Sequence, residues 1–181
     1  MKVKYRLEES DYLNYQLFFV SKSERINKAR KRNRLIIPLV YLGFGVILFF
    51  LESYYLSAAI VFFGLLWYFM YPIREKNRYI KNFKNHFNDY FKTKFERDFT
   101  IEINDDFILG NDGESDSKVP VSEIEEINEI PSLILLKLKT GDSFLLPKNT
   151  IPEIEEVKSK LKEIASKQNI SYNIENDWAW R

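Results

Sequence analysis

The chain has 181 residues, and its 27 Lys and Arg against 26 Asp and Glu give a formal net charge of +1. It therefore lacks the overall basic excess that nucleic-acid-binding proteins use, and we predict no nucleic-acid partner. With no Cys and one His, disulfides, thiolate metal sites and cysteine nucleophiles are excluded. The charge is unevenly divided. Residues 1–97 hold 18 basic and 8 acidic side chains, net +10, whereas residues 98–181 hold 9 and 18, net −9. We expect the two halves to have different roles.

Residues 1–34 combine a short strand pattern with a basic helical segment. Val3, Tyr5 and Leu7 alternate with basic residues, which predicts a half-buried strand. A lone strand leaves its backbone groups unpaired, so we expect it to join the sheet predicted in the C-terminal half. Ser10 is predicted to cap a helix that continues through the basic stretch KARKRNR. We predict no signal peptide, because the first 30 residues contain no apolar segment.

Residues 35–73 contain two uncharged runs of 17 and 21 residues on either side of Glu52. As helices they would extend about 26 Å and about 32 Å, against a hydrocarbon core of roughly 30 Å. With only Glu52 and Ser53 available for a turn, they are predicted to form a tight transmembrane hairpin. The alternative is a pair of buried helices in a soluble core. It is disfavoured because neither run has the polar face that soluble helices normally keep.

Basic residues flank this hairpin on both sides, which predicts that both termini are cytoplasmic. The predicted location is a plasma membrane. The basic stretch KARKRNR resembles a nucleic-acid patch by composition, but a topology signal explains it more simply beside an uncharged run. Some of the basic side chains are also candidate contacts for anionic lipid: Arg30, Lys31, Arg32, Arg34, Arg74, Lys76 and Arg78.

Residues 74–97 are predicted to form a long amphipathic helix that leaves the membrane. Its apolar positions recur every three, four or seven residues: Ile73, Ile80, Phe83, Phe87, Phe91 and Phe95. Two interpretations fit this pattern. The helix lies on anionic lipid through its basic stripe, or it packs against the first helix and its charges only set the topology. We favour packing, because helices in bundles show the same periodicity.

Residues 98–170 have the pattern of a small β domain. Short β-prone segments alternate with turn residues, which predicts antiparallel hairpins. Pro152 opens a predicted helix whose apolar stripe would cover the sheet. Residues 171–181 are predicted to be a tail, and Trp178 and Trp180 are expected to pack on the β domain, with membrane anchoring as the alternative. The predicted fold class is thus an α+β membrane protein.

No catalytic, cofactor-binding or metal-ligating residues are predicted. The sequence has no Gly-rich phosphate loop, no nucleophile elbow and no paired-His metal helix. The acidic residues between Asp105 and Asp116 lack the spacing of a calcium loop, so a solvated turn is expected there. We therefore predict neither a cofactor nor an enzymatic activity.

The order of these segments resembles a known family. DYLNYQLFFVSKS, a basic stretch, a two-helix hairpin, RYIKNFKNHFNDYFK, VSEIEEINEI and LLPKNTI follow one another along most of the chain. Together they resemble the YcxB-like bacterial membrane proteins. The most specific element is Ser122-Glu123-Ile124 followed by Pro147-Lys148, although Val121 replaces the aromatic residue common in that family. The resemblance implies a bacterial inner-membrane location and a C-terminal domain similar to pleckstrin-homology-like (PH-like) folds.

The leading hypothesis is a membrane-anchored cytoplasmic module for interaction or sensing. Its acidic β domain would dock on the basic helices or bind a protein partner, and docking would weaken with salt because exposed charges are screened. The first alternative is an enzyme or carrier that binds a lipid headgroup through the basic helices. The second is a structural subunit of a bacterial membrane complex. The lipid bilayer is the one partner common to all three, and the sequence predicts no oligomeric state.

Overall fold

The computed structural model describes residues 1–90 and 98–180, with side chains for residues 1–85 and 98–180. Within these residues the protein is α+β, with four α-helices and two four-stranded sheets. It divides into two compact units. One unit comprises residues 1–16 and 83–179, and the other comprises residues 17–82 and the two C-terminal residues. The first is called here the β unit and the second the hairpin unit.

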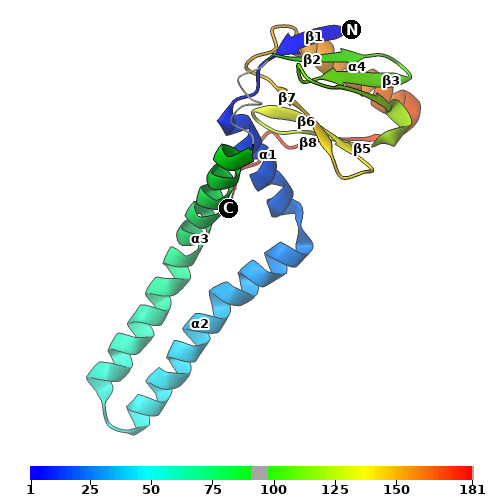
Figure 1. Ribbon diagram of the computed structural model, residues 1–181. Helices are drawn as coiled ribbons and strands as arrows, with labels where there is room; N and C mark the ends of the chain where they lie inside the picture. Colours follow the sequence, from blue (N-terminus) through cyan, green and yellow to red (C-terminus); the bar gives the residue numbers. More distant parts are fainter. Residues whose placement is uncertain (91–97, 181) are drawn as a thin grey trace. The chain divides into compact units, whose positions relative to one another are not determined.

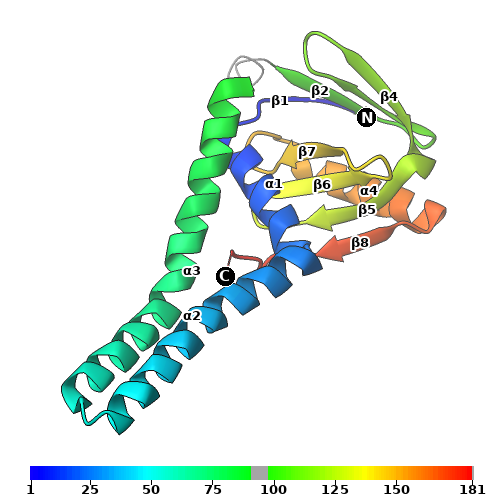
Figure 2. The same ribbon diagram turned by 60° about the horizontal axis from the view of Figure 1, so that its bottom comes forward.

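The hairpin unit contains α2 (Glu24–Phe50) and α3 (Tyr54–Tyr90) as far as Asn82, and these helices run antiparallel beside each other in Figures 1 and 2. Only three residues, 51–53, connect them, and Glu52 adopts a positive φ of 60° in this turn. The tight helical hairpin predicted from the sequence is thus present. Helix α3 continues without interruption from the apolar run into the basic segment. The predicted positions Phe91 and Phe95 lie outside the described residues.

The helix predicted from Ser10 through the basic stretch is in fact two helices. Helix α1 (Glu9–Lys22) begins one residue before Ser10, and the Asp11 carboxylate accepts the Glu8 amide at 2.9 Å at its start. The chain then breaks at Ser23, whose extended backbone and hydroxyl, 3.4 Å from the Ile26 amide, cap α2. Serine stabilises this arrangement because its side chain accepts a hydrogen bond from an otherwise unpaired amide of the first turn.

Small residues let α2 and α3 approach closely. A Cβ on Gly45 would lie 2.6 Å from Val61, and one on Gly64 would lie 2.9 Å from the Tyr41 Cβ atom. At the Gly45 contact the Ser57 hydroxyl donates a 2.7 Å hydrogen bond to the Gly45 carbonyl, and Ser57 is buried. Close backbone approach through small residues is typical of helix pairs in membranes.

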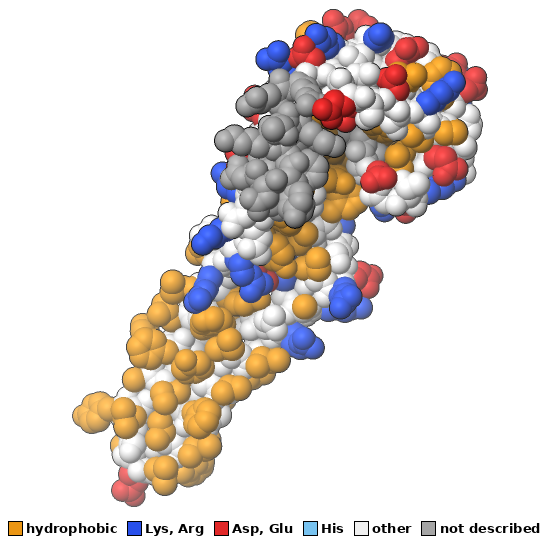
Figure 3. All heavy atoms as spheres, viewed as in Figure 1, with side chains coloured by type: hydrophobic (Ala, Val, Ile, Leu, Met, Phe, Trp, Pro, Cys, Tyr) orange, Lys and Arg blue, Asp and Glu red, His pale blue; other side chains and the backbone are white. Residues whose placement is uncertain are grey.

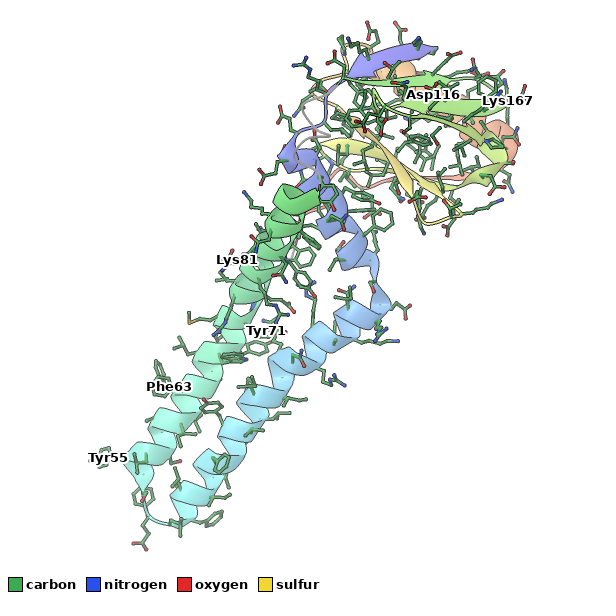
Figure 4. The ribbon with its side chains drawn as sticks, in the orientation of Figure 1. Tyr55, Phe63, Tyr71, Lys81, Asp116 and Lys167 are labelled. Atoms are coloured by element: carbon green, nitrogen blue, oxygen red, sulfur yellow. The ribbon has the colours of Figure 1, made fainter. Side chains whose placement is uncertain are left out.

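The outer surface of the hairpin is apolar. Large hydrophobic side chains are exposed along both helices; Tyr55 is 94% exposed and Phe50 80%. Figure 4 shows Tyr55 and Phe63 pointing away from α2, and Figure 3 shows hydrophobic side chains over the hairpin surface with Lys and Arg at the end away from the turn. By length and composition, α2 and α3 are both able to cross a membrane.

The β unit contains two four-stranded sheets and a helix. One sheet has the order β1 (Lys2–Tyr5), β2 (Phe99–Ile103), β3 (Phe107–Asn111), β4 (Asp116–Pro120). The other has the order β7 (Ser143–Pro147), β6 (Leu133–Leu138), β5 (Ile124–Glu129), β8 (Ser171–Ile174). A 3-10 turn, η1 (Val121–Glu123), joins β4 to β5, and α4 (Ile154–Gln168) precedes β8.

The N-terminal strand joins the C-terminal sheet, as predicted. Val3 lies opposite Ile101 in the antiparallel β1–β2 pair, and the N-terminal amino group donates to the Ile103 carbonyl at 2.9 Å. The prediction of an entirely antiparallel domain was wrong at one edge. Strand β8, in the segment predicted as a tail, pairs parallel with β5. The chain reaches this edge because α4 intervenes, and parallel pairing requires such a crossover.

One hydrophobic core fills the space between the sheets and α4. Side chains with no exposed surface come from both sheets, such as Ile101 and Ile127, and from α4, such as Leu161. Helix α4 supplies this face through Val157, Leu161 and Ile164, three and four residues apart. The sequence predicted this covering stripe. Burial of apolar side chains from residues 3 and 161 in one core links the two ends of the chain.

Candidate functional site

A hollow lined mainly by polar and charged residues lies between α2 and α3, next to the apolar part of the hairpin. It has a volume of about 340 Å³ and is called here the collar pocket. Its lining residues all belong to the hairpin unit: Asn27, Arg30, Lys31, Arg34, Tyr71, Pro72 and Glu75. Three cationic side chains and one carboxylate give this lining a formal charge of +2. An excess of positive charge in a concave site favours anions.

A nearly buried ion pair forms one wall of the collar pocket. Arg30 Nε donates to Glu75 Oε2 at 2.7 Å, and the two side chains are only 15% and 4% exposed. The Tyr71 hydroxyl donates to the other carboxylate oxygen at 3.0 Å. Both oxygens of Glu75 therefore accept hydrogen bonds from fixed donors. Such charge-assisted bonds hold Arg30 in a defined orientation beside the hollow.

The position of Arg34 in the lining depends on a proline. Pro72 lacks an amide hydrogen, so the Tyr68 carbonyl one turn earlier in α3 has no helical donor. Arg34 Nε occupies this position and donates to the Tyr68 carbonyl at 3.3 Å. The Arg34 guanidinium also lies 4.0 Å from the centre of the Tyr68 ring, a cation–π contact. The proline thus creates the acceptor that positions Arg34.

The C-terminal Trp180 contacts Arg30. Its ring centre lies 4.4 Å from the guanidinium carbon of Arg30 and 5.4 Å from the centre of the Tyr79 ring. The sequence-based expectation that Trp180 packs on the β domain was therefore wrong. A tryptophan indole is the preferred face for an arginine cation, which explains why the tail reaches this position on the basic helices.

The seven predicted lipid-contact residues lie in different environments. Arg30, Lys31 and Arg34 meet in the collar pocket. Arg32 lines a separate hollow on α2 with Arg25 and Lys28. On α3 the cations stand against aromatic rings or in solvent: Arg74 lies over Trp67, Arg78 over Tyr79, and Lys76 is exposed. The structure thus brings three of the seven together in the collar pocket, places Arg32 in another hollow and leaves the three cations of α3 outside both.

Sequence reasoning missed Glu75, Tyr71 and Trp180 as members of this site. Glu75 stands as a lone acid in a basic segment directly after an apolar run, and Tyr71 precedes it by one helical turn. This spacing could have predicted a contact between Tyr71 and Glu75, because residues four apart lie on the same helix face. No local pattern marks Trp180, whose contact with Arg30 joins positions 150 residues apart.

The acidic cluster of the β unit forms turns and ion pairs. One Asp112 carboxylate oxygen accepts the amides of Glu114 and Ser115 and the Ser115 hydroxyl, while Asp105 is paired with Lys160 and Lys167. Across the described parts of the chain, no group of three or more His, Cys, Asp or Glu residues is arranged to hold a metal ion. The solvated turn predicted at this cluster is what the structure contains.

No protein-family model matches the chain, and no curated protein matches it significantly.

Proposed function

We propose that this chain is an integral protein of a bacterial plasma membrane that carries a cytoplasmic module for interaction or sensing. One observation supports the proposal above all others, namely the nearly continuous exposed apolar surface of α2 and α3. In the most apolar 18-residue windows of these helices, 6% and 11% of the residues are buried. A soluble protein rarely exposes so large a contiguous apolar surface. Lipid is the solvent that makes it stable.

The proposed orientation places both termini in the cytoplasm. The turn of the hairpin carries Glu52 as its charged residue, whereas basic side chains gather at the opposite ends of both helices. Positively charged flanks are retained on the cytoplasmic side during insertion. Aromatic rings lie near both ends of the apolar segments, for example Tyr54 near the turn and Trp67 near the basic ends. Such rings are typical of the two membrane interfaces.

The β unit is proposed to be the interacting part, without enzymatic activity. Acidic side chains are exposed on its first sheet and adjoining loops, for example Asp106, Glu114 and Asp116. A surface of this sign suits a basic protein partner, since complementary charge speeds encounter and selects partners. The resemblance to YcxB-like proteins belongs to this proposal, as does a PH-like ancestry for the two sheets and their C-terminal helix.

Single-cysteine labelling tests insertion and orientation together, because the native chain contains no cysteine. Glu52→Cys places a thiol in the turn, and Ser166→Cys places one on the exposed side of α4. In spheroplasts, we expect a membrane-impermeant maleimide to label Glu52→Cys directly and Ser166→Cys only after permeabilisation. Both variants should stay in the membrane fraction after alkaline carbonate extraction.

The unmodified chain serves as the unlabelled control. The opposite labelling pattern would overturn the orientation. Recovery of the protein in the soluble fraction without detergent would overturn insertion itself.

A further inference from the structure

We propose that the collar pocket binds the phosphate group of an anionic membrane phospholipid. This inference rests on the proposed membrane insertion, and it assigns a ligand class to one defined hollow among the basic side chains of the hairpin. A lipid headgroup and a free phosphate would both present a phosphate oxyanion to the guanidinium and ammonium groups of the pocket. The depth of the pocket along the membrane helices favours a lipid as the source of this phosphate.

The charge balance of the pocket favours an anion. Of its three cations, Arg30 is neutralised by Glu75 at 2.7 Å, which leaves Lys31 and Arg34 as the surplus. Among the described residues, Arg34 makes one hydrogen bond, through Nε to the Tyr68 carbonyl. A guanidinium has five donors, and its planar fork matches a phosphate. The remaining Arg34 donors and the exposed Lys31 ammonium are therefore available to an oxyanion in the pocket.

The pocket is organised before any ligand arrives. The Glu75 carboxylate and the Trp180 ring fix Arg30, and the Tyr68 carbonyl and ring fix Arg34. Side chains held in place lose little conformational freedom on binding, so more of the interaction energy contributes to affinity. These fixed contacts distinguish Arg34 from Arg25 and Lys28. Those two side chains line the separate hollow on α2 and are exposed.

The position of the pocket along the helices selects lipid. Its lining ends at Arg34 on α2 and begins at Tyr71 on α3, and the exposed apolar side chains Leu35 and Met70 follow immediately toward the turn. With these apolar segments in hydrocarbon, the pocket stands at the level of the phosphates of the cytoplasmic leaflet. A lipid bound there keeps its acyl chains against the apolar helices, whereas a soluble phosphate gains no such contact.

Binding is measured on the detergent-purified full chain by native mass spectrometry, with phosphatidylglycerol as the anionic probe and phosphatidylcholine as the neutral one. The pocket variant is Lys31→Gln with Arg34→Gln. The matched control is Arg25→Gln with Lys28→Gln, which removes the same charge from the same helix. At about 1 kcal/mol per cation, we expect phosphatidylglycerol binding to weaken about 10- to 30-fold in the pocket variant and less than about twofold in the control.

The single variant Lys31→Gln removes an exposed side chain and therefore tests the pocket even where the double variant folds poorly; about fivefold weaker binding is expected. Equal losses in the pocket and control variants, or no loss in either pocket variant, would overturn the assignment. Displacement of phosphatidylglycerol by millimolar inorganic phosphate would identify a soluble phosphate as the ligand instead. Carbonate extraction of the same variants keeps the two proposals apart, since a protein that stays in the membrane but lacks lipid selectivity contradicts only this inference.

Discussion

Glu129 joins four segments of the β unit through one buried carboxylate. It lies on β5 and accepts hydrogen bonds from Lys148 after β7 at 2.9 Å and from Tyr172 on β8 at 2.9 Å. Lys158 on α4 forms an ion pair with it at 3.2 Å. Burial alone raises the pKa of Glu129, but the bonds from Lys148, Tyr172 and Lys158 outweigh burial and lower the pKa to about 2. The charged form is therefore part of the folded structure.

Glu129→Gln is expected to destabilise the β unit by about 3 kcal/mol, because Lys148 and Lys158 lose the counter-charge in a site that is largely closed to water. Glu155→Gln is the matched control. It removes the other partner of Lys158, but Glu155 is 79% exposed, so less than about 1 kcal/mol is expected. Urea unfolding of the full chain in detergent, followed by circular dichroism, measures both changes. Similar midpoints for the two variants would contradict the buried network.

The contribution of Glu129 also has a defined pH dependence. Its ordinary pKa of 4.5 falls to about 2 in the folded chain. A carboxyl whose pKa is lowered by folding stabilises the protein fully above its unfolded pKa and loses this contribution as pH falls toward the folded value. The stability gap between the native chain and Glu129→Gln should therefore be constant from pH 7 to about pH 5 and shrink between about pH 4.5 and pH 2. A gap that widens on acidification would refute this assignment.

At the scale of elements, the packing of α2 on α3 depends on where glycine stands. Gly64 faces Tyr41 and the Pro38 backbone, whereas a Cβ at Gly43 would meet nothing within 4 Å. Gly64→Leu should force the helices apart at a cost of about 1–3 kcal/mol, as overpacked interfaces do. Gly43→Leu adds the same side chain without a clash, and the spacing should stay unchanged.

Spin labels at Ile36→Cys and Met70→Cys, both at exposed positions, report this spacing by double electron–electron resonance. The absence of native cysteine makes the labelling specific. A longer and broader distance distribution is expected for Gly64→Leu alone. Equal distributions in the two glycine variants would exclude the proposed contact.

The same elements explain which features the sequence could predict. The hairpin follows from two uncharged runs, β1 from alternation at Val3, Tyr5 and Leu7, and α4 from its apolar stripe, since each signal is local and periodic. The break at Ser23 was missed because a single capping serine competes weakly with a continuous helical pattern. Strand β8 and the Trp180 contact were missed because their partners lie far away in the sequence. The collar pocket was predicted only in part. Its cations were predicted, but their grouping depends on Pro72 and Glu75.

At the scale of the whole chain, the β unit is discontinuous, and the hairpin is inserted between its first strand and the rest. Residues 1–16 and 83–179 belong to one compact unit although α2 and most of α3 separate them in sequence. Bringing such distant segments into contact costs a large amount of chain entropy, and this cost slows folding. An antiparallel α2–α3 pair returns the chain and shortens the effective distance.

This arrangement predicts that a change at the N-terminus loosens strands about 100 residues away. Val3 is 4% exposed in the core and lies opposite Ile101, so Val3→Asp would bury an unpaired charge and is expected to cost about 3 kcal/mol or more. Lys2→Ser changes the neighbouring exposed residue and should cost less than about 0.5 kcal/mol. Hydrogen exchange of the full chain in detergent should show faster exchange in β2 and β3 for Val3→Asp alone. Because β1 supplies one edge of that sheet, unchanged protection of residues 99–111 would mean that the C-terminal strands fold without it.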